Sequence, residues 1–472
     1  MTRYGATASP RCGDVTGCCL HQGGGQATAG YRARHRARRR GHWAGRRGHW
    51  AGRREDQAAT TIAGIAAVAL AIGVARFALT PVAPLMLASG ALPGIGALAR
   101  MAMANYLGNL AGTALCVTVI PRTAQLRALR IAAATIVLVT AAMAGPTAGL
   151  PWLLLRALAG LAGAVVFVCA SSIVLSGLDL RNATAGTARL YLGIGTGIAL
   201  AALVVMPATG WRSAWLYLAV LAAALAFPAC RWIRQPSPGI GTSGHGDTGR
   251  RRPPTRAMSA LCAAFFLEGL GYIVTGTFLP DMPGKALPGG QAWLVAGLAA
   301  VPSCALWGRF VSRHGLARVL PGAFAVQAAG IALPAIVASP SAGLLSAVLF
   351  GGTFAAIVAM LFAWGGTLSD RPSPRSVGMM ACCYGAGQAL GPLLASRGIH
   401  TALLLGAGVV ACAIVPLLYL AWHTSGLRFR LVGKSEALAC GVLEDGDVGV
   451  YECTVCAQRE RASGTRRGEH AV

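Results

Sequence analysis

Between residues 60 and 422 the chain is made of apolar segments, each about 20 residues long, with short joints rich in Gly, Pro or Arg. A helix of about 20 mostly apolar residues matches the thickness of the hydrocarbon core of a bilayer. Only 12% of all residues are charged, which is about half the share found in soluble globular domains. The sequence therefore predicts an all-α membrane protein and argues against a soluble enzyme.

Twelve such segments follow one another, and the longest joint between them comes after the sixth. The predicted transmembrane helices cover residues 60–88, 98–120, 126–145, 151–177, 186–207, 211–231, 257–280, 291–311, 317–338, 341–366, 376–397 and 401–422. The joint is rich in Gly, Ser, Pro and Arg, as flexible linkers are. We expect an N-terminal six-helix half (60–233), a cytoplasmic linker (234–256) and a C-terminal six-helix half (257–422), with a ligand site between the halves at mid-membrane.

The basic residues are distributed unevenly among the loops. The loops on one side of the predicted membrane hold sixteen Lys and Arg residues, and those on the other side hold four. Because basic residues collect in cytoplasmic loops, this distribution places both termini in the cytoplasm and predicts a multi-pass protein of the cytoplasmic (inner) membrane. A net charge of +26 is also compatible with nucleic-acid binding. The loop distribution favours the membrane explanation, so no nucleic-acid partner is expected.

The two ends of the chain differ in composition from the apolar segments. Residues 1–59 form a basic low-complexity tail in which the repeat Gly-His-Trp-Ala-Gly-Arg-Arg occurs twice over 41–54. This tail is expected to be disordered. Three explanations compete: it binds anionic lipid, it binds nucleic acid through stacked Trp side chains, or translation truly starts near Thr60. The tail at 423–472 carries one Cys-x-x-Cys pair, a weak zinc signal, so no metal or cofactor is expected.

Three short motifs resemble those of the major facilitator superfamily. Residues 156–160 resemble its Arg-x-x-x-Gly signature, and residues 210–215 resemble the turn that opens its sixth helix. Residues 308–318 resemble its cytoplasmic loop motif, although Ser312 stands where the family often has Asp. The motif residues singled out in this loop are Gly308, Arg309, Arg313 and Gly315.

Longer blocks resemble one branch of that superfamily, the YbfB/YjiJ type. They occur in order from the first predicted helix to the eleventh, at residues 73–81, 104–108, 268–280, 350–354 and 384–392. The resemblance implies a secondary transporter with two parallel six-helix halves. It implies no particular substrate.

Three ionisable side chains fall inside predicted helices. A charge at the centre of a bilayer costs roughly 2.5–3.5 kcal/mol on insertion scales, so such residues mark a cavity or a partner. Arg76 lies past the middle of the first helix, where it either holds an anionic substrate or pairs with Glu268 or with carbonyl groups of a broken helix. Arg156 lies near the outer surface, where it either extends to the headgroups or, as the resemblance implies, takes part in proton transfer or substrate binding.

Glu268 is the only acidic residue within a predicted helix and lies near the midplane. Burial favours the neutral carboxyl and a nearby Arg favours the charged form, so the group can gain and release a proton as a cavity opens to either side. The alternative is a static ion pair that fixes helix packing.

Uncharged polar residues complete the candidate site. Glu268, Tyr272 and Thr275 are spaced by four and three residues and share one helix face. They either bind the substrate or form hydrogen bonds between helices. The full polar set comprises Asn105, Tyr106, Tyr272, Thr275 and Gln388.

Small residues also recur at helical spacing. Gly193, Gly195 and Gly197 predict close helix contacts rather than a dinucleotide site, because their spacing is wrong and no strand precedes them. Gly387 and Gly391 form a small-xxx-small pair followed by Pro392, which predicts a hinge or kink in the eleventh helix.

These features together predict a secondary active transporter of a small organic solute that works by alternating access and is coupled to protons. The two intramembrane Arg residues favour an anionic or carboxylate substrate. The alternatives are a proton-driven exporter of drugs or lipophilic compounds and a transport-inactive membrane sensor. A membrane enzyme is disfavoured because five acidic residues across the central 366 residues form no cluster. A monomer in contact with membrane lipid is expected.

Overall fold

The computed structural model describes residues 58–145, 149–176, 183–234, 255–279, 290–368 and 374–422. Within these residues the secondary structure is entirely helical. The predictions made for the two tails and for most of the linker fall outside the described residues.

The first transmembrane segment runs from Ala58 to Ala88 and includes the π-helix η1 (Ala69–Arg76) and the helix α2 (Leu79–Ala88). The last segment runs from Ile399 to Trp422 and begins with α13 (Ile399–Cys412). The helices between them are α3 (Ile95–Thr118), α4 (Gln125–Ala142), α5 (Leu150–Ser176), α6 (Ala183–Val205), α7 (Trp211–Trp232), α8 (Thr255–Phe278), α9 (Gln291–His314), α10 (Leu316–Ile336), α11 (Pro340–Thr367) and α12 (Pro374–Leu390), together with the 3₁₀ segments η2 (Arg122–Ala124) and η5 (Gly391–Arg397).

The twelve predicted transmembrane helices are confirmed. Within the described residues, 11 helical segments are long and apolar enough to cross a membrane. The remaining segment, α3, has 24 residues, a length of about 36 Å that is also sufficient. It is less apolar because Arg100, Asn105 and Asn109 lie within it.

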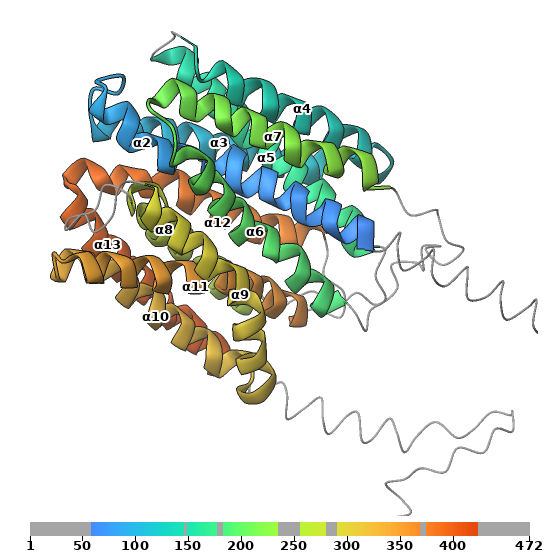
Figure 1. Cartoon of the computed structure of the whole chain (residues 1–472). Helices are drawn as coiled ribbons and strands as arrows, with labels where there is room; N and C mark the ends of the chain where they lie inside the picture. Colours follow the sequence, from blue (N-terminus) through green and yellow to red (C-terminus); the bar gives the residue numbers. More distant parts are fainter. Residues whose placement is uncertain are drawn as a thin grey trace, which may run out of the picture.

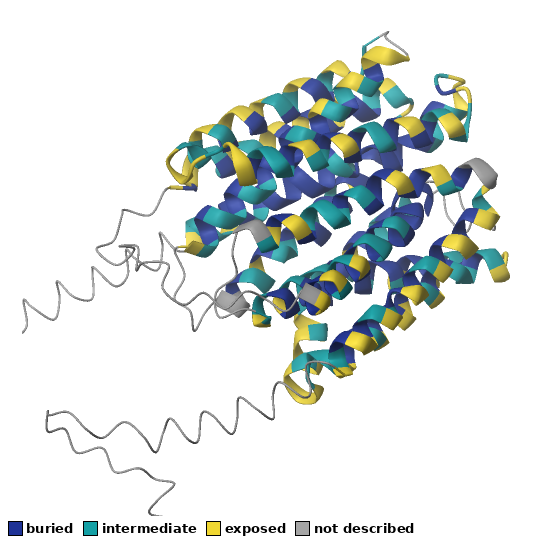
Figure 2. Ribbon diagram, turned by 180° about the vertical axis from the view of Figure 1, so that it is seen from behind, coloured by how far each residue is buried: buried dark blue, intermediate teal, exposed yellow. Residues whose placement is uncertain are grey.

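The helices form two bundles that lie side by side (Figure 1). The first bundle contains the first segment and α3–α7, and the second contains α8–α13. Across the interface α3 packs against α12 and α6 packs against α9. Buried residues concentrate between and within the bundles, whereas exposed residues cover the outside (Figure 2). Large apolar side chains such as Leu138 and Val220 are 69% and 70% exposed, as expected for a surface that faces lipid.

Glycines on α6 allow three helices to approach closely. Gly193 and Gly197 face the first segment, and a Cβ atom at Gly197 would lie 2.6 Å from the carbonyl oxygen of Ala69. Gly195 lies on the opposite side of α6, where a Cβ atom would collide with the backbone nitrogen of Val301 on α9. The prediction that these glycines serve close packing is therefore confirmed, and one of them lies at the interface between the halves.

The eleventh transmembrane segment changes helix type at the expected place. The α-helix α12 ends at Leu390, and the chain continues as the 3₁₀ segment η5 from Gly391, with Pro392 in its first turn. A Cβ atom at Gly391 would lie 2.7 Å from the carbonyl oxygen of Leu270, and one at Gly387 would collide with the carbonyl oxygen of Phe266. Both glycines therefore bring this segment against the backbone of α8.

The first segment is broken next to Arg76, as one of the alternatives for this residue assumed. The wide turns of η1 end at Arg76, and the backbone N–H of Thr80 bonds to the carbonyl of Phe77 instead of to that of Arg76. Pro81 and Pro84 follow and supply no N–H donors. The break therefore leaves carbonyl groups near the bilayer centre that need donors from elsewhere in the protein.

Candidate functional site

Two predicted site residues supply the missing donors at this break. Arg156 donates from Nη2 to the carbonyl oxygens of Ala75 and Arg76, at 3.2 and 3.0 Å. Asn105 donates from Nδ2 to the carbonyl oxygens of Ala75 and Arg156, at 3.0 and 2.9 Å. Both side chains are almost fully buried. Arg156 therefore does not extend to the headgroups, because its guanidinium binds broken-helix carbonyls, the role considered above for Arg76.

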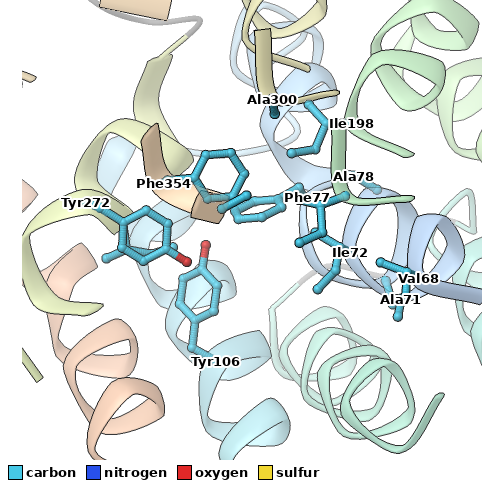
Figure 3. Packing of buried hydrophobic residues seen from close by; sticks show 14 of the residues in the cluster. Val68, Ala71, Ile72, Phe77, Ala78, Tyr106, Ile198, Tyr272, Ala300 and Phe354 are labelled. Carbon is cyan, nitrogen blue, oxygen red and sulfur yellow. The ribbon is translucent and has the colours of Figure 1, made fainter. Parts of the chain in front are cut away.

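Arg76 itself points toward the second bundle and lies among aromatic rings. Its guanidinium carbon is 5.5, 5.7 and 6.0 Å from the ring centroids of Phe77, Tyr106 and Tyr384. Its Nη2 makes a long hydrogen bond of 3.5 Å to the hydroxyl oxygen of Tyr272. The hydroxyl groups of Tyr106 and Tyr272 point toward the same space (Figure 3). Rings from both halves thus surround one cationic side chain.

Arg76 has no acidic partner in the described part of the chain. The only acidic residue described there is Glu268, and its Oε1 accepts a hydrogen bond of 2.9 Å from Nε2 of Gln327 on α10. The Nε of Arg76 is buried and has no hydrogen-bond partner. The ion pair between Arg76 and Glu268, one of the two structural alternatives for Arg76, is therefore not formed in this conformation.

Glu268 lies fully buried within the second half. Its Oε2 has no hydrogen-bond partner, and neither does Oε1 of Gln327. Tyr272 and Tyr384 are close enough to Glu268 to interact with it electrostatically, and both also interact with Arg76. The acid and the cation are therefore connected through tyrosines and not through direct contact.

On one side of Arg76 the two halves are held together. Thr80 donates a hydrogen bond of 2.8 Å to the carbonyl oxygen of Gly276. Tyr106 and Thr277 share a hydrogen bond of 3.3 Å. The ring of Phe77 packs edge-on against Trp293 at 5.4 Å between centroids. These contacts lie toward the ends of the first segment and of α8, beyond Arg76.

On the other side of Arg76 lies a cavity of about 30 Å³ within the first half, which is enough for a water molecule. Its walls come from η1, α3 and α5. The lining residues are Ala71, Ile72, Arg76, Asn105, Asn109, Thr113, Gly160, Gly163, Ala164 and Phe167. Gly160 and Gly163 let α5 pack closely against α3 and η1, and the amides and the guanidinium give the cavity polar walls.

The structure brings most of the predicted polar residues together around Arg76. Gln388 donates a hydrogen bond of 2.5 Å from Nε2 to the hydroxyl oxygen of Tyr272, so α8 and α12 are joined at the site. Glu268, Tyr272 and Thr275 are all buried, as expected for one helix face. The hydroxyl of Thr275 has no hydrogen-bond partner among the described residues and does not bond to the Arg76 cluster.

The loop-motif residues lie away from the site, at the junction of α9 and α10. Gly315 has φ = 81°, a left-handed conformation that favours glycine, and it ends α9 and begins α10. Arg309 and Arg313 are exposed there, and Ser312 donates a hydrogen bond of 2.8 Å to the carbonyl oxygen of Arg309.

Sequence reasoning missed two residues of the site. Tyr384 lies in one of the blocks that resemble the YbfB/YjiJ branch, residues 384–392, but was not proposed as a site residue. Gln327 lies in an apolar helix, and its position 59 residues from Glu268 gives no local signal. An intramembrane amide is itself uncommon enough to have marked Gln327 as a candidate.

Comparisons with known proteins agree with the fold. The family described as "Uncharacterised MFS-type transporter YbfB" matches residues 68–418. The chain belongs to this family of major facilitator transporters. No curated protein matches the chain. A crystal structure of the nucleoside transporter NupG (D323A mutant) is similar, with a TM-score of 0.56 and 14% sequence identity over 77% of this chain and 99% of that chain. At this identity the similarity concerns the fold only.

The family and the membrane-spanning helices together identify a multi-pass membrane transporter for a small molecule. The resemblance to the YbfB branch is confirmed over almost the whole membrane part of the chain.

Proposed function

We propose that this transporter moves a small organic anion across the cytoplasmic membrane by alternating access, coupled to protons. The observation that carries the proposal is Arg76, a half-buried guanidinium between the two halves that has no acidic partner among the described residues. An unpaired buried charge is costly, and a bound anion offsets that cost. The planar fork of N–H donors in Arg suits a carboxylate, which it can bind through two hydrogen bonds.

The contacts around Arg76 support a conformation that is closed on the outer side, and α3 and α12 also touch at their opposite ends, at Val117 and Gly378. If the termini are cytoplasmic, as the loop charges indicate, the contact between Thr80 and Gly276 lies on the outer side. The cavity beside Arg76 then lies on the cytoplasmic side, because Ala71 and Ile72 precede Arg76 in the first segment. In the alternate state the outer contacts would open while the halves close on the inner side. We expect the transporter to do this as a monomer surrounded by membrane lipid.

Glu268 and Gln327 support the coupling to protons. Two buried atoms lack partners, Oε2 of the acid and Oε1 of the amide. A proton on Oε2 would let the acid donate to the amide, so that acid and amide form a doubly bonded pair. Without this proton the carboxylate has no nearby cation to offset its burial. The present conformation therefore suits the protonated acid, and a conformation that exposes Glu268 to water would release the proton.

The test is anion flux into proteoliposomes under an imposed pH gradient, with the wild type beside Glu268→Gln. We expect the wild type to accumulate a carboxylate in response to the gradient. The variant should still exchange carboxylate across the membrane but should not accumulate it. Equal accumulation by both proteins would remove Glu268 as the coupling acid.

The same assay separates the competing functions. Export of lipophilic cations is less favoured, because a second cation would be repelled by Arg76. Robust flux of cations but not of anions would reverse that preference. Ligand binding without any flux would indicate a transport-inactive sensor.

A further inference from the structure

Aromatic side chains concentrate around Arg76. They make up only 7% of the chain, yet rings from four different helical segments gather at this one side chain. Phe77, Tyr106 and Tyr384 lie within 6.0 Å of its guanidinium, and Tyr272 bonds to it. Behind them Tyr272, Phe350 and Phe354 have nearly parallel ring planes, within 13° of one another. This concentration around one cationic side chain needs a reason beyond filling space.

Most of these rings have no room for a ligand. Phe77, Tyr106, Tyr272, Phe350 and Phe354 are each no more than 4% exposed. Phe77 and Tyr106 of the first half contact the second half here, and Phe77 lies beside Phe354 (Figure 3). They define an aromatic wall at the closed end of the site.

Two rings beside Arg76 differ from that wall because they are only half-buried. Tyr384 on α12 belongs to the second half, and its ring centroid is 6.0 Å from the guanidinium. Phe167 on α5 belongs to the first half and lines the cavity next to Arg76. Each half of the protein therefore offers one partly accessible ring beside the same unpaired cation.

We propose that the anion held by Arg76 is a planar aromatic carboxylate whose ring contacts Tyr384 and Phe167, an inference that rests on the function proposed above. The carboxylate accepts two hydrogen bonds from the guanidinium. The ring of the ligand packs against the two protein rings in offset or edge-to-face arrangements, which contribute beyond the area they bury. The cavity of about 30 Å³ holds only a water molecule in this conformation, so the ring of the ligand would enter when the halves move apart on this side. Because the ring contacts come from both halves, the bound ligand would draw the two halves together on the cytoplasmic side.

The experiment measures binding of radiolabelled benzoate to the purified full-length protein in detergent. Unlabelled competitors are benzoate, cyclohexanecarboxylate and benzamide. Cyclohexanecarboxylate keeps the charge and the approximate size but lacks the planar ring, whereas benzamide keeps the ring but lacks the charge. The variants are Tyr384→Leu, Phe167→Leu and Tyr384→Phe. The matched control is Phe227→Leu, since Phe227 is 67% exposed on the outer face of α7.

We expect the wild type to bind benzoate about threefold to tenfold more tightly than cyclohexanecarboxylate. Benzamide should not compete. The preference for benzoate should disappear in Tyr384→Leu and shrink in Phe167→Leu, while Tyr384→Phe and the control keep it. Retained binding of cyclohexanecarboxylate in Tyr384→Leu would show that this variant is folded.

Equal affinity of the wild type for benzoate and cyclohexanecarboxylate would overturn the inference but leave anion binding at Arg76 intact. A preference that survives both ring-removing variants would also overturn it, because the ring would then bind elsewhere. Binding of neither carboxylate would count against the proposed anion function as well.

Discussion

The pair formed by Glu268 and Gln327 predicts a pH dependence of stability that one substitution removes. The neutral acid can donate to the amide, so the two buried atoms that lack partners satisfy each other. The ionised acid leaves both atoms unpaired. In Glu268→Gln an amide N–H replaces the acid proton at every pH. The stability of the variant should therefore exceed that of the wild type by a margin that grows as pH rises from 5 to 9.

The magnitude follows from the unpaired atoms. Each buried polar atom without a partner costs about 1–3 kcal/mol, so loss of the proton costs at least about 2 kcal/mol. The sign follows from linkage. An unfolded Glu releases its proton near pH 4.3, so wherever the folded protein keeps the proton, the free energy of unfolding falls by about 1.4 kcal/mol per pH unit as pH rises. A rise of two pH units above about pH 4.3 is therefore enough to show the loss of wild-type stability.

The assay is thermal unfolding in detergent from pH 5 to pH 9, with Gln327→Leu as a second variant. Because Gln327→Leu removes the donor to Glu268, it should lower the unfolding temperature across the whole range. If the wild type and Glu268→Gln lose stability in parallel as pH rises, the acid–amide pair does not govern the pH dependence and the reasoning fails.

Three further predictions concern packing and the helix break. Arg156→Met should lower the free energy of unfolding by about 2–4 kcal/mol, because it leaves carbonyl groups of the break without donors. Chemical unfolding measures this loss. An unchanged free energy of unfolding would mean that water replaces the side chain as donor. Gly195→Ala should weaken the contact between the halves and lower both unfolding temperature and flux, whereas Gly322→Ala, which places its methyl group in open space, should change neither. Thr80→Val removes a hydrogen bond between the halves and should lower the free energy of unfolding by about 0.6 kcal/mol. An unchanged free energy of unfolding would show that this bond does not stabilise the protein.

The architecture could be predicted from the sequence because the bilayer fixes the length of each helix. Apolar runs of about 20 residues allow one interpretation, and all twelve observed segments begin and end within a few residues of the predicted positions. The alternating glycines of α6 were equally informative, since residues two apart on a helix face opposite sides. Gly193 and Gly197 contact the first segment, while Gly195 contacts α9.

The arrangement of the site could not be predicted in the same way, because it depends on contacts between distant helices. Periodicity places Arg76 and Glu268 near the midplane but cannot say that Tyr272 lies between them or that Gln327 pairs with the acid. Arg156 was expected at the outer surface because it lies near the start of its own helix, and nothing in the sequence showed that the break in the first segment lies beside it. The π-helix turns its carbonyl groups toward Arg156, and a break of this kind leaves no clear periodic signal.

The central claim is that Arg76 binds an anion between the two halves. It is tested most directly by the shift in unfolding temperature that a panel of carboxylates, sugars and lipophilic cations produces in the purified wild type and in Arg76→Gln. We predict that carboxylates alone raise the unfolding temperature of the wild type, since a ligand that binds the folded state stabilises it in proportion to the logarithm of its concentration over Kd. The variant should fold but lose this response. Carboxylate stabilisation that persists unchanged in Arg76→Gln, or stabilisation by cations alone, would contradict the account.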